Sequence, residues 1–324
     1  MTNLSYSLLF WYKKNKRDLP WRRKSNIKNP YFVWLSEIML QQTTVKTVLN
    51  YYEKFIIKWP NVKSLSKAKL DNVLFSWQGL GYYNRAINLH KCAKIISKNY
   101  NGNFPNSVKL LSELPGIGEY TASAILAIAF NKPYIPLDGN IERVIKRLLN
   151  LKSKAEISKE NLIKQKKILG TSDRSSDYAQ ALMELGALIC KPKKPLCEKC
   201  PLIKNCKSYK KQDFEIAVKS KKKIDKFFMV KIFTRGTKIL LIKNTKFNFL
   251  KNLKIFPMEE IPKPKNLKKS LNFKMSNMNM NINIKVMKGM SNIKNSSWIE
   301  QTKFNSYTLP TFTKKIFSSL GKYL

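Results

Sequence analysis

Apolar residues recur at intervals of three and four positions through the N-terminal part of the chain, which is the spacing that predicts helices with one buried face. A first helix is predicted over residues 4–15. A second begins at Asn29-Pro30, because asparagine caps helices well and proline fits a first turn. The same spacing predicts helices that begin at Val45 and Ile141 and another over 175–190. This part of the chain is therefore expected to be all-α.

The pattern changes after a charged segment, residues 218–226, which predicts a linker. Two β-rich runs follow, over 227–233 and 238–242, on either side of a glycine-containing hairpin turn. A chain of 324 residues is long enough for two domains, each with its own core. We predict an all-α domain over 1–217 and a smaller α+β domain over 227–324.

The charge of the chain favours a polyanionic partner. It carries 62 basic and 20 acidic residues, a formal net charge of +42, and nucleic acid is the first candidate. No apolar run reaches the length of a membrane span, and the N-terminus lacks a signal-peptide pattern. We expect a cytoplasmic monomer that binds no membrane. Because the chain has one histidine, His90, a histidine-dependent triad or a histidine-rich zinc site is not expected.

The segment from Leu114 to Ile125 predicts a helix, a tight turn and a second helix. Gly116 and Gly118 let the backbone bend, and the helix that begins near Gly118 would direct free N–H groups toward an anion such as a DNA phosphate. An ordinary helix C-cap is the alternative. Asp138 follows twenty residues after Gly118, just before another predicted helix. It can serve as an N-cap, as a reactive carboxylate, or as both.

Two further segments are candidates for chemistry. Glu37 is the single charged residue in an apolar run, and a carboxyl removed from water has the raised pKa that a general acid needs. The alternative is a glutamate that faces solvent or pairs with a lysine. Gly79-Leu80-Gly81-Tyr82-Tyr83 predicts a loop that presents an aromatic ring to bases, or else a turn with its tyrosines in the core.

Four cysteines lie close together in the sequence, with the spacing C-x6-C-x2-C-x5-C: Cys190, Cys197, Cys200 and Cys206. In a reducing cytosol such clustering predicts a metal site rather than disulfides. Structural zinc sites usually pair two Cys-x-x-Cys knuckles, and the chain has one. The ferredoxin spacing also differs. Cys92 lies apart and is expected to be a buried thiol.

Together, the four motifs resemble the MutY family of adenine DNA glycosylases: Ser36–Thr43, Gly79–Tyr83, Leu114–Ala124 with Asp138, and the four cysteines. The resemblance covers residues 4–207 densely. It implies a helix-hairpin-helix glycosylase domain whose four cysteines hold a [4Fe–4S] cluster. It also implies a Nudix-like C-terminal domain, in which Glu259-Glu260 runs at once into Ile261-Pro262, so the metal-binding helix of a Nudix hydrolase cannot form.

In this family, adenine is removed from double-stranded DNA where it lies opposite 8-oxoguanine or guanine. The resemblance makes Glu37 the general acid and Asp138 the group that stabilises the oxocarbenium ion. By the same resemblance, Gln42 and Tyr82 would enter the base stack, and Arg22 and Leu40 would line the adenine pocket. Asn140 and Tyr120 would position the sugar and Asp138. Gly116 and Gly118 would belong to the hairpin that binds the DNA backbone.

The family reads 8-oxoguanine with a loop of His-x-Phe-Ser-His type. The nearest counterpart, Lys288–Asn292, keeps the serine as Ser291 and lacks both histidines. Two other functions stay open. An endonuclease III-type glycosylase/lyase would have a lysine where this chain has Tyr120. A non-enzymatic iron–sulfur DNA-binding protein would lack Glu37 or Asp138, and both are present.

Overall fold

The computed structural model describes residues 3–153, 155–215, 223–264, 271–275, 277–288 and 293–320. The chain forms two compact units, one of residues 1–67 with 88–218 and one of residues 68–87 with 219–324. The second unit thus includes a segment, residues 68–87, that the sequence prediction assigned to the helical domain. Within the described part of the chain, no helix is long and apolar enough to cross a bilayer.

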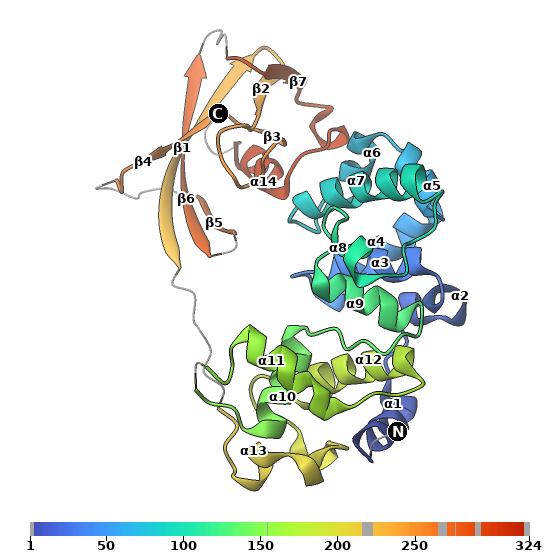
Figure 1. Ribbon diagram of the computed structural model, residues 1–324. Coiled ribbons are helices and arrows are strands. Elements are labelled where there is room, and N and C mark those ends of the chain that lie inside the picture. Colours follow the sequence, from blue (N-terminus) through green and yellow to red (C-terminus); the bar gives the residue numbers. More distant parts are fainter. Residues whose placement is uncertain are drawn as a thin grey trace. The chain divides into compact units, whose positions relative to one another are not determined.

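The first unit is helical (Figure 1). Its α-helices are α1 (Asn3–Asn15), α2 (Lys24–Ile27), α3 (Pro30–Leu40), α4 (Val45–Lys58), α5 (Val62–Lys67), α7 (Asn84–Asn99, which begins in the second unit), α8 (Val108–Ser112), α9 (Glu119–Ile128), α10 (Gly139–Leu149), α11 (Lys159–Gln165), α12 (Ser175–Glu184) and α13 (Lys207–Lys210). Short 3₁₀ turns cover Pro20–Arg22, Lys166–Leu169, Cys197–Lys199 and Ile203–Asn205, and a π-turn covers Leu185–Ile189.

Local sequence explains where several of these helices begin. The side chain of Asn29 accepts a hydrogen bond from the backbone N–H of Tyr31, and Pro30 is the first residue of α3, as predicted. Gly116 has a φ of +80°, and a Cβ atom there would lie 3.0 Å from the Cβ of Asn88, so this position needs glycine. Gly118 is the N-cap of α9.

One core of the first unit lies between α1, α10 and α12. Buried apolar side chains from these three helices pack together, among them Leu8, Ile145 and Leu182. The helix predicted over residues 175–190 is regular only to Glu184, because the last five residues before Cys190 form the π-turn. Three of the four clustered cysteines are partly buried against the same core, so α1 and α10 support the cysteine loop.

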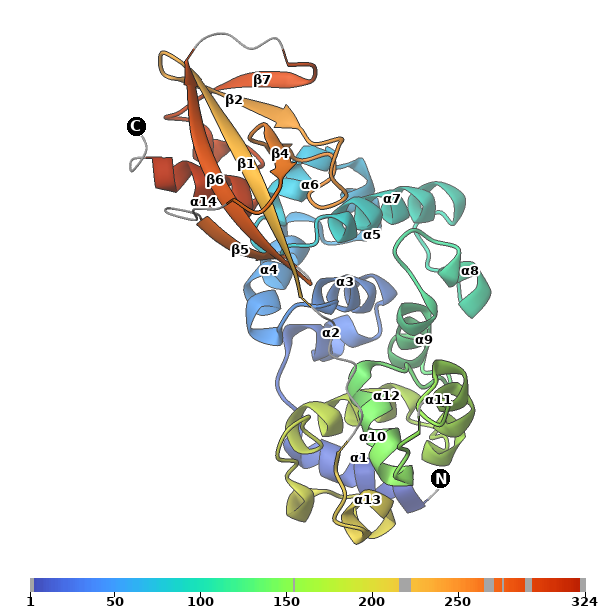
Figure 2. The ribbon, with the colours of Figure 1, turned by 90° about the vertical axis from the view of Figure 1, so that its left-hand side faces the viewer.

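The second unit combines helix α6 (Leu70–Ser76) with a mixed sheet and helix α14 (Thr311–Ser319) (Figure 2). Its strands are β1 (Ile224–Arg235), β2 (Lys238–Lys243), β3 (Lys254–Ile255), β4 (Met258–Ile261), β5 (Leu271–Met275), β6 (Met278–Lys288) and β7 (Ser296–Glu300), and a 3₁₀ turn covers Phe304–Ser306. The sheet order is β3-β2-β1-β6-β5, while β4 pairs with β1 and β7 pairs with β2.

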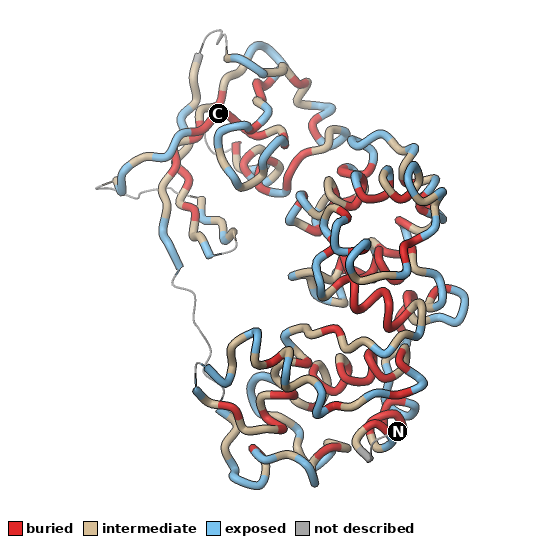
Figure 3. Tube along the Cα trace, viewed as in Figure 1, coloured by how far each residue is buried: buried red, intermediate tan, exposed pale blue. Residues whose placement is uncertain are grey.

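The predicted hairpin is present, since Arg235 pairs with Lys238 across the β1–β2 turn. Strand β1 begins at Ile224, inside the segment predicted as a linker. It runs parallel to β6 in a register that pairs Ile224 with Met278 and Thr234 with Lys288. Buried positions alternate along the middle of β1 (Figure 3), and its buried side chains share a core with apolar residues of α14.

Candidate active site

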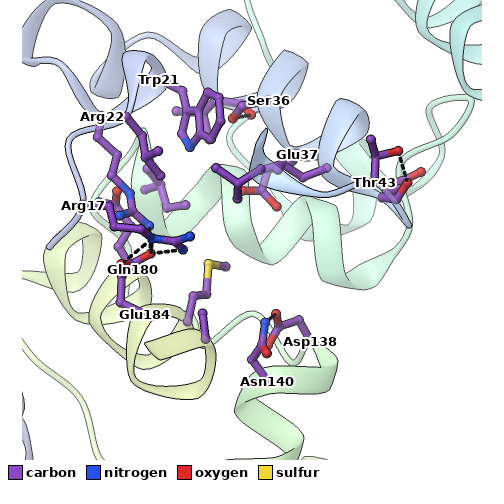
Figure 4. A pocket seen from close by; sticks show the side chains of 18 of the residues that line it. Arg17, Trp21, Arg22, Ser36, Glu37, Thr43, Asp138, Asn140, Gln180 and Glu184 are labelled. Atoms are coloured by element: carbon purple, nitrogen blue, oxygen red, sulfur yellow. Dashed lines mark hydrogen bonds and ion pairs between the residues drawn. The ribbon is translucent and has the colours of Figure 1, made fainter. Parts of the chain in front are cut away.

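A pocket in the first unit collects side chains from α3, α9, α10 and α12 (Figure 4). The pocket is lined by seven residues that the sequence predicts to have a function: Arg22, Glu37, Leu40, Gln42, Tyr120, Asp138 and Asn140. Figure 4 shows Glu37 on α3 and Asp138 at the start of α10, on two sides of the same space. Residues that are far apart in the chain thus form one site.

Glu37 is held away from water, which is one of the interpretations that its apolar run left open. Glu37 is 7% exposed. The phenol of Tyr120 donates a hydrogen bond to its carboxyl oxygen Oε2 over 2.6 Å. Burial raises the pKa of Glu37 to about 7, against the opposing effect of the Tyr120 hydrogen bond, and the charge of Asp138 adds to the rise. Near neutral pH this carboxyl therefore exists in both protonation states.

Asp138 is both a helix cap and a pocket residue. Its Oδ1 accepts the backbone N–H of Ile141 over 2.7 Å, which caps α10, and its Oδ2 accepts the side-chain amide of Asn140 over 2.9 Å. Burial raises the pKa of Asp138, while the hydrogen bonds from Ile141 and Asn140 oppose that rise. The two interpretations of Asp138 are therefore compatible, because the cap holds the carboxylate in a fixed orientation.

An ion cluster in the pocket wall was missed by the sequence reasoning. Glu184 on α12 is fully buried, and its carboxylate accepts hydrogen bonds from Arg17 Nε over 2.9 Å and from Arg22 Nη2 over 2.9 Å. Although burial acts to raise it, the pKa of Glu184 is held below its usual value by the two guanidinium groups. The sequence around Glu184 has the same feature as the sequence around Glu37, because Glu184 is the one acidic residue in the otherwise uncharged run 178–190.

Arg22 also keeps one donor available. Its Nη1 atom is buried and has no hydrogen-bond partner among the described residues, and the Arg22 side chain lines the pocket. A buried N–H group without a partner is costly, so a ligand that accepts a hydrogen bond at this point would satisfy it.

Asn140 is held in place by Arg143. The Nη2 atom of Arg143 donates to Asn140 Oδ1 over 2.8 Å and to the carbonyl of Gly186 over 2.7 Å. Gly186 lies in the π-turn after α12, and a Cβ atom there would lie 2.5 Å from the Cβ of Asn140. The close approach of the π-turn to α10 thus depends on glycine at this position.

Known DNA repair proteins are similar to this chain. Residues 35–167 match the HhH-GPD superfamily of base excision DNA repair proteins. The adenine DNA glycosylase of Buchnera aphidicola subsp. Acyrthosiphon pisum is 40% identical over 276 residues, which cover 79% of this chain and 75% of that protein. The adenine DNA glycosylase of Buchnera aphidicola subsp. Baizongia pistaciae is 45% identical over 227 residues, which cover 69% of this chain and 64% of that protein.

The chain belongs to the adenine DNA glycosylase family. A solved structure of a thermostable thymine-DNA glycosylase is 31% identical to this chain and superposes with a TM-score of 0.58. The superposition covers 64% of this chain and 95% of the glycosylase chain. The predicted fold class is therefore confirmed as a helix-hairpin-helix glycosylase unit with a smaller unit of mixed sheet and helices.

The family's cysteine motif lies at one place in the structure. All four cysteines line one small cavity, together with apolar residues and Arg147, and none of them forms a disulfide. Among the described residues, no three His, Cys, Asp or Glu side chains are close enough to hold one metal ion.

The remaining family positions lie elsewhere. Gly116 and Gly118 form the turn before α9, in the first unit. Tyr82 belongs to the second unit, where it is 46% exposed. Ser291, which the resemblance makes the nearest counterpart of a serine in the family's lesion-reading loop, lies outside the described residues.

Proposed function

We propose that this chain removes adenine from double-stranded DNA, by hydrolysis of the N-glycosidic bond where adenine lies opposite 8-oxoguanine or guanine. The observation that carries the proposal is the pair of carboxyl groups, Glu37 and Asp138, that line one pocket with different hydrogen-bond partners. The names of the curated relatives support adenine as the base.

In the proposed reaction, one carboxyl group donates a proton and the other stabilises positive charge. Adenine is a poor leaving group as an anion, and protonation at N7 by Glu37 makes it a neutral one. As the bond between C1′ and adenine breaks, the sugar gains oxocarbenium character, which the Asp138 carboxylate stabilises by its charge or by a transient covalent bond. Water then adds to C1′ and loses a proton, which leaves an abasic site. The adenine must first be flipped out of the duplex.

A direct assay tests this function. The full chain is incubated with duplexes that hold adenine opposite 8-oxoguanine, guanine or thymine, and free adenine is measured. We expect release opposite 8-oxoguanine and guanine and little opposite thymine. Absence of adenine release from all three duplexes would exclude the proposed activity and leave a DNA-binding role.

The pH dependence of base release provides a second test. The reaction needs protonated Glu37 and ionised Asp138, so the rate is expected to fall as the pH rises through about 7 and again in acid. Because the Tyr120 hydrogen bond lowers the pKa of Glu37, Tyr120→Phe should move the alkaline limb to higher pH. Single-turnover rates across the pH range measure both effects. Tyr134→Phe, outside the pocket, is the control, and an alkaline limb that stays in place in Tyr120→Phe argues against Glu37 as the acid.

We also propose that the enzyme has no lyase activity. A lyase needs a primary amine that attacks C1′ and forms a Schiff base, and the phenol of Tyr120 on the first turn of α9 cannot form an imine. The wild-type chain should leave an intact abasic site, and Tyr120→Lys should increase borohydride trapping of a covalent complex. Glu119→Lys, one position earlier on the exposed surface, is the matched control. Strand cleavage by the wild type at the rate of base release would instead favour the endonuclease III-type function.

For the cysteine loop we propose a [4Fe–4S] cluster held by Cys190, Cys197, Cys200 and Cys206, which would fix a lysine-rich loop for contact with DNA. Anaerobically purified protein should be brown and contain about four irons per chain. Cys200→Ser should lower the iron content, whereas Cys92→Ser, outside the cavity, should not. Protein that contains zinc and no iron would disprove the assignment.

For the C-terminal unit we propose a Nudix-like, catalytically inactive domain that reads the base opposite adenine. Glu259 and Glu260 lie on strand β4, which supports the absence of a glutamate-rich metal-binding helix at this point. The part played by Ser291 in such reading stays a prediction.

A further inference from the structure

The loop that carries Tyr82 is held in a defined conformation by its glycines and by hydrogen bonds. Gly79, Gly81 and Tyr82 all have left-handed backbones, with φ values of +101°, +72° and +47°. The indole N–H of Trp77 donates to the carbonyl of Gly81 over 3.1 Å, and Arg85 Nη2 donates to the same carbonyl over 3.2 Å. These bonds fix the turn on the side away from its tip.

Arg85 also orders the aromatic ring at the tip. Its guanidinium carbon lies 5.3 Å from the ring centre of Trp77 and 5.6 Å from that of Tyr82. These are cation–π distances, and they restrain the Tyr82 ring although the residue is 46% exposed. The loop thus presents one exposed aromatic side chain in a restrained position.

The base of this loop is bound to the C-terminal part of the chain. The side-chain amide of Gln78 donates from Nε2 to the carbonyl of Tyr307 over 3.1 Å. Its Oε1 accepts a hydrogen bond from the ammonium group of Lys314 on α14 over 2.7 Å. Just before the loop, the carbonyl of Asp71 on α6 accepts a hydrogen bond from the hydroxyl of Thr308 over 3.2 Å. These contacts join two segments that lie more than two hundred residues apart in the sequence.

From these contacts we propose that Gln78 and Lys314 form a clamp through which the C-terminal unit positions Tyr82. Gln78 is suited to this role because its amide supplies a donor and an acceptor at once, so one side chain bonds both Tyr307 and Lys314. The ring of Tyr82 and the C-terminal sheet would then meet DNA as one body. A pre-ordered ring loses less conformational freedom when it enters a base stack, so the clamp should raise the rate of adenine release.

The inference rests on the proposed function only for the purpose of Tyr82, and the experiment keeps the two apart. Hydrogen–deuterium exchange of residues 79–83 is measured in the full chain without DNA, for Lys314→Met and Gln78→Ala. Exchange should rise by about tenfold in both, because the clamp that opposes local opening is lost. Lys315→Met, an exposed lysine on the same helix, is the control and should match the wild type.

The second arm is a double-mutant cycle on single-turnover adenine release opposite 8-oxoguanine. Lys314→Met should slow release several-fold in the wild-type background and have no further effect in a Tyr82→Ala background, because the two residues act through one ring. Unchanged exchange in both clamp variants, or equal effects of Lys314→Met in the two backgrounds, would overturn the proposal. If the wild-type chain releases no adenine, the proposed function fails, and the exchange arm still decides whether the clamp exists.

Discussion

The Glu37→Gln variant is expected to bind adenine-containing duplexes like the wild type and to release adenine at least about a hundredfold more slowly. Glutamine has the same shape and its carbonyl can still accept the Tyr120 hydrogen bond, but it cannot supply a proton to adenine N7. Single-turnover kinetics with saturating enzyme separate this loss from a change in binding. Glu142→Gln, on the first turn of α10 and outside the pocket, is the control. A wild-type rate in Glu37→Gln would remove the general acid from the mechanism.

The same variant has an expected effect on stability. The pKa of Glu37 rises from 4.5 to about 7 on folding, so ionisation of this carboxyl opposes folding. The stability that the protonated form contributes is complete below the unfolded pKa and is lost as the pH rises through about 7. Glu37→Gln cannot ionise, and at alkaline pH it should gain up to about 3 kcal/mol over the wild type. Denaturant unfolding at acid and alkaline pH measures the difference, which should shrink in acid.

Asp138→Asn should lower the rate of base release by on the order of a hundredfold or more, because the charge that faces the developing oxocarbenium ion is removed. Asparagine caps helices about as well as aspartate, so the bond to Ile141 that starts α10 can be kept. Because asparagine has one acceptor oxygen, the bond from Asn140 is lost, and the thermal stability of Asp138→Asn should fall, but by less than that of Asp138→Ala, which loses both bonds.

The contrast between Asp138→Asn and Asp138→Ala distinguishes the two roles of this residue. Asp138→Ala removes the cap as well as the charge, and should cost about 1 kcal/mol of stability in addition to the catalytic loss. If Asp138→Asn releases adenine at the wild-type rate, the capping role is sufficient to explain Asp138 and the oxocarbenium assignment is wrong.

Features that depend on neighbouring residues could be predicted from the sequence. Asn29 and Pro30 begin α3 through a side-chain cap and a fixed φ, and both effects act within one turn. The hairpin between β1 and β2 follows from a turn next to two β-rich runs. The apolar residues beside Glu37 on the helix made it a candidate for burial, and they left a glutamate that faces solvent as the alternative. The family motifs added the fold class, which the comparisons confirm.

Contacts between distant segments were decided by the tertiary structure alone. Nothing near Glu184 in the sequence indicates that it pairs with Arg17 and Arg22, since those partners come from the other end of the helical unit. Strand β6 carries the alternation of a half-buried strand, with Met280, Ile282 and Ile284 separated by asparagines, but this local pattern does not show that its partner is β1.

The grouping of residues 68–87 with the C-terminal strands has the same origin. The sequence of this segment reads as one more helix and loop of the helical domain, and its bonds to Tyr307 and Lys314 have no local signal. The residue types available for chemistry and the starts of most helices could be predicted from the sequence, because helix caps and apolar spacing act over a few residues. Which of those residues meet, and with which partners, was decided only by folding, because the energy of a buried pair depends on chain segments that the local pattern does not contain.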